Sequence, residues 1–111
     1  MPAANSGATG RDAAILDQVR ALVIRSLGAR QAVVYLFGSW ATGRRHGASD
    51  IDIAIEAAEP LAPGLLARLR EALEESTIPY RVDVVDLVDA DPAFRERVRR
   101  EGVAWTAFAN D

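Results

Sequence analysis

One short segment, residues 50–56, constrains the fold and chemistry of this chain more than any other. It reads Asp-Ile-Asp-Ile-Ala-Ile-Glu, so its three isoleucines alternate with polar or small residues. This alternation is typical of a β-strand with one buried face, because side chains at i and i+2 lie on the same side of a strand. The isoleucines therefore point to a core. Asp50 and Asp52 lie together on the other face, with Cα atoms about 6.7 Å apart.

Two carboxylates this close repel each other, and at neutral pH a positive partner must stabilise both in the charged form. Mg²⁺ does so in many proteins, bound by one or two carboxylates together with water and substrate phosphates. Asp is also disfavoured in strands, so strand stability does not explain the pair. We expect Asp50 and Asp52 to form a metal site; the alternative is an ordinary solvent-facing strand.

A Gly-Ser pair precedes these aspartates. The apolar run at residues 33–37 predicts a strand, and Gly38-Ser39 predicts a turn into a short helix. A helix N-terminus offers free backbone N–H groups to an anion, and Gly38 allows a phosphate to approach closely. The Ser39 hydroxyl is suited to cap the helix or to bind a phosphate oxygen. A simple turn explains the pair in isolation, but its position eleven residues before Asp50 favours a nucleoside triphosphate site.

Together these residues resemble the minimal nucleotidyltransferase domain of the DNA polymerase β superfamily. The similarity runs from about residue 33 to residue 105. It rests on Gly-Ser-Trp-Ala-Thr-Gly at 38–43, Ser-Asp-Ile-Asp at 49–52 and Arg-Val-Asp-Val at 81–84. The resemblance implies that the catalytic and metal-binding residues are Asp50, Asp52 and Asp83. It implies that the nucleotide-binding residues are Gly38, Ser39 and Ser49.

Asp83, the third carboxylate that the resemblance implies, has a close neighbour in the sequence, Asp86. A period of two places Asp83 and Asp86 on opposite faces of a strand, so only one of them can join the pair. The motif selects Asp83.

Thr42 departs from the family pattern, because many relatives have arginine there. Arg44 or Arg45 would have to supply that charge.

Two other residues near the motif have ordinary explanations. Trp40 lies in the first turn of the expected short helix, and we rank inward packing above base stacking or partner contact. His46 is the only histidine in the chain and lies in a polar loop. An exposed loop histidine is therefore favoured over a catalytic one.

Composition limits the classes of protein that this chain can belong to. We expect a disordered tail over residues 1–10 and one domain over residues 11–111. There is no cysteine, and no apolar run approaches the roughly 20 residues of a membrane span. The net charge of −3 argues against direct binding of nucleic acid, which requires clustered basic residues. We expect a cytoplasmic protein with no membrane partner.

Helical and strand patterns alternate along the chain. Helices are predicted at about 12–27, 65–76 and 92–101, with strands at 32–37, 50–56 and 81–88 and a short edge strand within 103–108. The predicted class is α/β (α+β). We expect a small mixed sheet with helices packed on one face and the aspartates on the other.

The resemblance also implies an activity and a partner. The expected reaction is transfer of AMP from ATP to a hydroxyl of a partner protein, with two Mg²⁺ ions for which Mn²⁺ is the substitute. Minimal members are usually paired with a separately encoded all-helical protein. In one arrangement that protein is a HEPN toxin, with an Arg-x4-His-type RNase motif, and this chain is its antitoxin. Two alternatives stay open: a catalytic subunit acting on a small molecule, and a non-enzymatic antitoxin that inhibits by binding.

Overall fold

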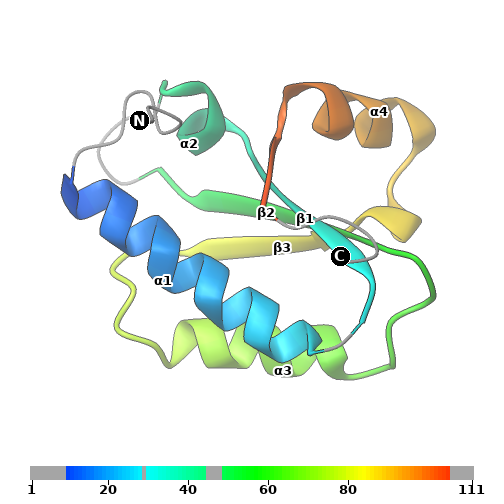
Figure 1. The fold of residues 1–111 in the computed structure, drawn as a ribbon, viewed down its shortest axis with the longest axis horizontal. Coiled ribbons are helices and arrows are strands. Elements are labelled where there is room, and N and C mark those ends of the chain that lie inside the picture. The colour runs from blue at the N-terminus through cyan, green and yellow to red at the C-terminus, as the bar shows by residue number, and fades with distance from the viewer. Residues whose placement is uncertain (1–9, 29, 45–48, 106–111) are drawn as a thin grey trace.

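The structure is a computed structural model that describes residues 10–28, 30–44 and 49–105. In these ranges the chain forms one four-stranded sheet with helices on both sides of it (Figure 1). The helices are α1 (Gly10–Leu27), α2 (Ser39–Thr42), α3 (Leu65–Glu74) and α4 (Pro92–Glu101), with a 3-10 helix, η1, at Leu87–Asp89. The strands are β1 (Ala32–Phe37), β2 (Ile51–Ala57), β3 (Val82–Asp86) and β4 (Val103–Ala104).

The sheet is mixed, as predicted, with strand order β3-β2-β1-β4. Strand β1 pairs antiparallel with both β2 and β4, whereas β2 and β3 are parallel. The parallel pair requires a crossover connection, and α3 provides it. The expected edge strand near the C-terminus is present as β4; residues 106–108 of that prediction lie outside the described residues.

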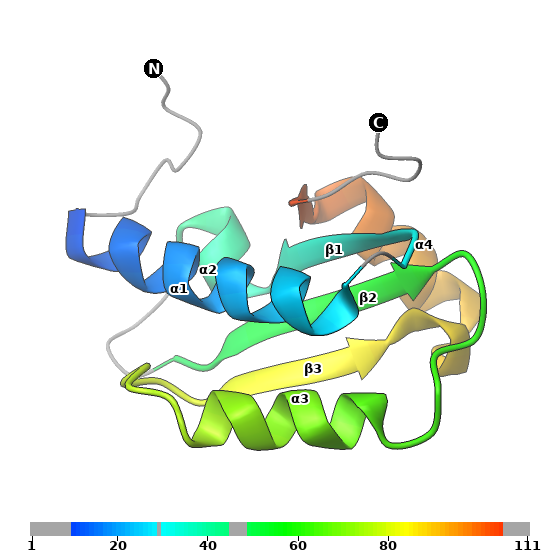
Figure 2. The same ribbon diagram turned by 60° about the horizontal axis from the view of Figure 1, so that its bottom comes forward.

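The isoleucine face of β2 forms the centre of the main core. Ile51, Ile53 and Ile55 are fully buried. Helices α1 and α3 lie side by side across this face of the sheet (Figure 2). The alternation in the sequence therefore predicted the buried face of the strand correctly.

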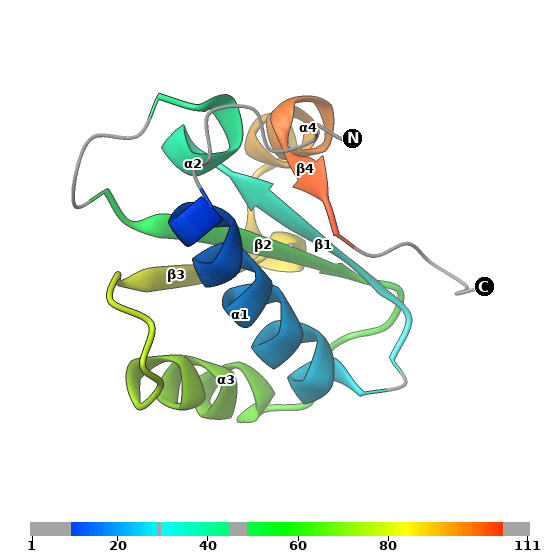
Figure 3. The same ribbon diagram turned by 60° about the vertical axis from the view of Figure 1, so that its left-hand side comes forward.

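The opposite face of the sheet carries a second, smaller core. Here Val98 and Phe94 of α4 pack with Leu87 of η1 against Ala54 and Tyr35. The expected helices on one face are α1 and α3, and α4 adds a partial cover to the other face (Figure 3). Only two apolar side chains of α4, Phe94 and Val98, make this contact. Two residues are too few to predict from the sequence which face of the sheet the helix covers.

The two ends of the chain lie largely outside the described residues. Of the expected tail at residues 1–10, only Gly10 is described, and it begins α1. At the other end, the Trp105 N–H donates to the Val34 carbonyl at 2.7 Å. The Arg20 side chain donates to the Trp105 carbonyl at 3.1 Å, which connects this segment to α1. None of the described helices is long and apolar enough to cross a membrane.

An ion pair joins α4 to the sheet, and we expect it to make stability depend on pH. Arg99 of α4 donates to the Glu56 carboxylate, and the Tyr35 hydroxyl donates to Glu56 Oε1 at 3.4 Å. The Arg99 hydrogen bonds are the main cause that lowers the pKa of Glu56. A carboxyl group with a lowered pKa contributes stability when the pH is above its ordinary pKa. This contribution is lost as the pH falls through the lowered pKa.

In Arg99→Gln the free energy of unfolding should therefore be lower than in the wild type at neutral pH. The difference should shrink in acid, where Glu56 is protonated in both proteins. Urea unfolding at several pH values measures it, with the exposed Arg100→Gln as the matched control. An equal loss at all pH values would indicate lost packing and not the ion pair.

Candidate active site

The sheet register places two of the predicted carboxylates side by side. Asp52 of β2 lies directly opposite Asp83 on one side and Phe37 on the other. Paired residues in neighbouring strands share a face. The row Phe37, Asp52, Asp83 therefore crosses three strands on the face opposite the isoleucines.

Asp50, the remaining predicted carboxylate, does not belong to this row. Asp50 comes immediately before β2 and is exposed to solvent. Within the part of the chain that the structure describes, no three acidic, histidine or cysteine side chains converge into one metal-binding cluster. The assembled unit is the pair Asp52–Asp83, with Asp50 two residues away along the chain. Asp86, the rejected alternative to Asp83, instead accepts a hydrogen bond from the Val88 N–H and caps η1.

The electrostatics of the pair favour a cation. Burial is the main cause that raises the pKa of Asp52, and the charges of Asp83 and then Asp50 raise it further. A bound divalent ion removes this repulsion, and carboxylate oxygens are the donors that Mg²⁺ prefers. The donor set of this site therefore fits such an ion.

Gly38 packs directly against the Asp52 carboxylate. Its backbone has φ 77° and ψ −156°, a region that is essentially restricted to glycine. A Cβ atom at this position would lie 2.4 Å from Asp52 Oδ2. The Gly38 carbonyl accepts hydrogen bonds from the Ala41 and Thr42 N–H groups, which begins α2. The turn thus places the backbone of Gly38 next to the Asp52 carboxylate.

Ser39 does not have the capping role that we considered for it. Gly38 is the N-cap residue of α2, and no side chain forms a capping hydrogen bond there. The helix begins at Ser39 itself, one residue earlier than a serine cap requires. Binding of a phosphate oxygen by the Ser39 hydroxyl stays a prediction.

Trp40 packs inward, as we ranked first, and it also connects the two halves of the motif. Its side chain is buried and lies edge to face with Tyr80 at 5.1 Å between ring centroids. Its indole N–H donates to the Ser49 carbonyl at 3.0 Å. This contact connects α2 to the residue just before Asp50. Arg44 is exposed, and Arg45 and His46 lie outside the described residues.

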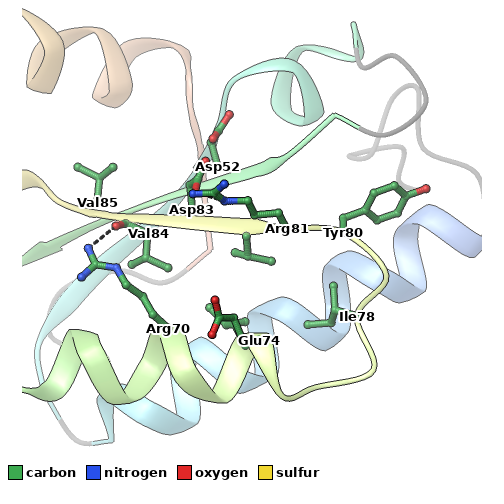
Figure 4. A pocket seen from close by; sticks show the side chains of 11 residues that line it. Asp52, Arg70, Glu74, Ile78, Tyr80, Arg81, Asp83, Val84 and Val85 are labelled. Atoms are coloured by element: carbon green, nitrogen blue, oxygen red, sulfur yellow. Dashed lines mark hydrogen bonds and ion pairs between the residues drawn. The ribbon is translucent and has the colours of Figure 1, made fainter.

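An open groove of about 850 Å³ leads along edge strand β3 to the Asp52–Asp83 pair (Figure 4). Two arginines in it were not singled out from the sequence. Arg81 Nε lies 3.1 Å from Asp83 Oδ1, and Arg70 of α3 donates to the Val84 carbonyl at 2.7 Å. Arg81 lies two residues before Asp83, and in a strand such residues share a face, so the sequence could have indicated that Arg81 lies beside Asp83. Nothing in the sequence indicated Arg70, because its contact joins a helix to a strand edge.

Arg81 is expected to compete with a metal ion for Asp83. Both side chains of the pair are exposed, so their attraction is weak. Arg81→Gln should therefore increase Mn²⁺ affinity only modestly, by about two- to fivefold. Calorimetric titration measures this, and the same substitution in an Asp83→Asn background is the control. If the increase persists there, it arises from general charge and not from the contact with Asp83.

The fold and the site together define a class of protein. A glycine turn beside carboxylates on adjacent strands of a small mixed sheet is the arrangement that the resemblance to nucleotidyltransferases predicted. Residues 27–105 match the family described as Polymerase beta, Nucleotidyltransferase. The chain belongs to this family.

Known proteins similar to this chain are named as protein-modifying enzymes and antitoxins. A relative from Haemophilus influenzae, named a probable protein adenylyltransferase MntA, is 42% identical over 67 residues. That match covers 60% of this chain and 59% of the relative, so the chain spans less than two thirds of the relative's length.

Solved structures give a similar result over more of the chain. A toxin–antitoxin complex with AMP-PNP contains a chain that is 31% identical, with a TM-score of 0.66, covering 81% of this chain and 74% of that one. A complex of a tri-AMPylated Shewanella oneidensis HEPN toxin with an MNT antitoxin contains a chain that is 28% identical. Its TM-score is 0.55, and the match covers 84% of this chain and 71% of that one.

Proposed function

We propose that this chain is a protein adenylyltransferase that acts as the antitoxin of a separately encoded, all-helical HEPN toxin. It transfers AMP from ATP to a hydroxyl of that partner. The observation that carries the proposal is the contact of Gly38 with Asp52, which in turn lies opposite Asp83 in the sheet register. A phosphate-binding turn and an acidic pair thus adjoin each other, as phosphoryl transfer requires.

The similar proteins support the choice of nucleotide and acceptor. The Haemophilus relative is named an adenylyltransferase, one related complex contains AMP-PNP, and the toxin of another carries AMP groups. Steric inhibition alone would have no use for an acidic pair in which burial and then the charge of Asp83 raise the pKa of Asp52. This pair therefore favours the enzymatic alternative.

The proposed reaction is an in-line displacement at the α-phosphorus of ATP. The hydroxyl oxygen of the acceptor forms a bond to the α-phosphorus, while the bond from this phosphorus to the α–β bridging oxygen breaks and pyrophosphate leaves. Gly38, Ser39 and the start of α2 hold the departing phosphates through backbone N–H groups, and Ser49 contributes to nucleotide binding. In this proposal the acceptor enters on the opposite side, along the groove beside β3 that Asp83 lines, and Asp83 takes the hydroxyl proton.

The acidic residues also define the metal requirement. Asp50, Asp52 and Asp83 would hold two Mg²⁺ ions, for which Mn²⁺ is the expected substitute. Bound in this way, divalent ions neutralise phosphate charge and lower the pKa of a coordinated hydroxyl. The chain itself contributes the position of the carboxylates and the close approach of the Gly38 backbone to Asp52.

Intact-mass analysis of the helical partner tests the proposal. The partner is incubated with this chain, Mg²⁺ and each nucleoside triphosphate in turn. We expect a mass increase of one or more AMP groups with ATP, and no increase without Mg²⁺. A stable complex without any adduct would overturn protein modification and favour a small-molecule acceptor or inhibition by binding.

A further inference from the structure

Strand β3 forms one edge of the sheet and carries Asp83 of the acidic pair. In the strand order β3-β2-β1-β4 it is bonded on one side only, to β2 (Figure 2). This edge is five residues long, whereas β4 at the other edge has two residues. An edge strand presents unpaired N–H and C=O groups to another chain, so the outer edge of β3 is a place where a further strand can pair.

The register decides which backbone groups of β3 point outward. The Ile51 N–H of β2 donates to the Arg81 carbonyl at 2.9 Å, and the two strands are parallel. Backbone groups alternate in direction along a strand. The odd-numbered residues of β3 therefore bond to β2, and Val82 and Val84 direct their N–H and C=O groups away from it. The Arg70 side chain confirms this direction, because it reaches the Val84 carbonyl from α3 at 2.7 Å.

The outward groups have room for a partner. Within residues 10–28, 30–44 and 49–105, no strand pairs with this edge. A carbonyl oxygen has two lone pairs, so the Val84 carbonyl can accept a second hydrogen bond beside that of Arg70. The groove of about 850 Å³ runs along the same edge, with Arg70 and Glu74 of α3 on its other side (Figure 4). This volume lies in the upper part of the roughly 300–1,000 Å³ of ligand pockets, enough for a short stretch of polypeptide.

We propose that the acceptor segment of the partner binds this edge as an added, extended strand, an inference that rests on the proposed function. Residues paired across neighbouring strands share a face of the sheet, with Cβ atoms about 4.5–5.5 Å apart. The residue of the added strand opposite Asp83 therefore points to the acidic face, and a hydroxyl side chain at this position meets Asp83. Its neighbours in the added strand point to the other face. Main-chain hydrogen bonds to Val82 and Val84 hold the segment.

The order of groups across the sheet supports this placement. From the outer edge inward, an added strand brings the acceptor hydroxyl first, then Asp83, then Asp52 with Gly38 against its carboxylate. The hydroxyl and Gly38 thus lie on opposite sides of the acidic pair. An in-line displacement needs this order, because the nucleophile and the departing pyrophosphate lie on opposite sides of the α-phosphorus. The other edge of the sheet, at β4, lies next to β1 on the Gly38 side and does not provide it.

Proline substitutions at the two edges test the inference. Val82→Pro removes an outward N–H group but no bond to β2, and proline is tolerated at the first residue of an edge strand. The matched control is Ala104→Pro on β4. Because the Trp105 N–H donates to the Val34 carbonyl, the Ala104 N–H points away from β1 in the same way. Circular dichroism and titration of ATP in Mn²⁺ check that each variant is folded and binds the nucleotide.

We expect Val82→Pro to raise the KM for the partner by about five- to tenfold, the scale of one lost hydrogen bond, and to change kcat much less. Ala104→Pro should have the KM of the wild type. An unchanged KM in Val82→Pro, or an equal rise in the two proline variants, would overturn the inference.

Amide exchange measured by NMR on the wild-type chain gives a direct readout that needs no variant. In the complex with the partner, the amide protons of Val82 and Val84 should exchange about tenfold more slowly than in the free chain. A complex in which neither amide is protected would overturn the inference. Protection already present in the free chain would also overturn it, because a second copy of this chain would then occupy the edge.

The partner's mass separates this failure from failure of the proposed function. An AMP adduct on the partner without protection at β3 removes only the added strand. If the wild type modifies no partner, the proposed function fails and the inference fails with it.

Discussion

Replacement of Asp52 by asparagine should abolish AMP transfer while leaving the fold intact. The variant retains the size of the side chain but loses the negative charge of Asp52. We therefore expect the rate of partner modification to fall by about 10³-fold or more. In EDTA its thermal midpoint should equal or exceed that of the wild type. Burial and two neighbouring carboxylates raise the pKa of Asp52, which shows that its charge is unfavourable without a cation.

The effect of metal on stability separates this explanation from a folding defect. Mn²⁺ should raise the thermal midpoint of the wild type, because an ion that binds the folded state stabilises it, and it should not raise that of Asp52→Asn. Asp17→Asn removes one exposed carboxylate from α1 and is the matched control for net charge. Modification of the partner by Asp52→Asn at the wild-type rate would contradict the catalytic role of the pair.

A single methyl group at Gly38 should have the second largest effect. In Gly38→Ala the new Cβ atom would meet Asp52 Oδ2 at 2.4 Å, so the carboxylate must move. Displacement of a catalytic group by about 1 Å can cost about 100-fold in rate, and we expect a loss of this order. The backbone region of Gly38 is essentially restricted to glycine, so the free energy of unfolding should also fall by about 1–3 kcal/mol.

Gly64→Ala is the control for backbone strain. Gly64 also has a positive φ, of 89°, but a Cβ atom there meets only the Arg68 guanidinium, at 3.5 Å. This variant should lose about 1–2 kcal/mol of stability and retain full activity. Urea unfolding and the intact-mass assay on both variants give the comparison. Equal loss of activity in the two alanine variants would show that strain, and not the position of Asp52, controls the rate.

Local patterns in the sequence were sufficient to predict the helices and strands and to select the residues of the motif. The alternation of Ile51, Ile53 and Ile55 identified a strand and its buried face, because side chains in a strand alternate whatever that strand packs against. The same period separated Asp83 from Asp86, which caps η1. A glycine next to a serine indicated a turn, although the N-cap proved to be Gly38 and not Ser39.

Contacts between distant segments were decided only by the tertiary structure. The ion pair of Arg99 with Glu56, the contact of Gly38 with Asp52 and the meeting of Phe37 with Phe94 each join separate elements. No period within one segment encodes such contacts, since they depend on strand register and on the placement of α4. The sequence by itself therefore determined the helices and strands and predicted which residues carry out nucleotidyl transfer. The sheet register determined that Asp52 and Asp83 are neighbours, and the strand order placed β3 at the edge of the sheet.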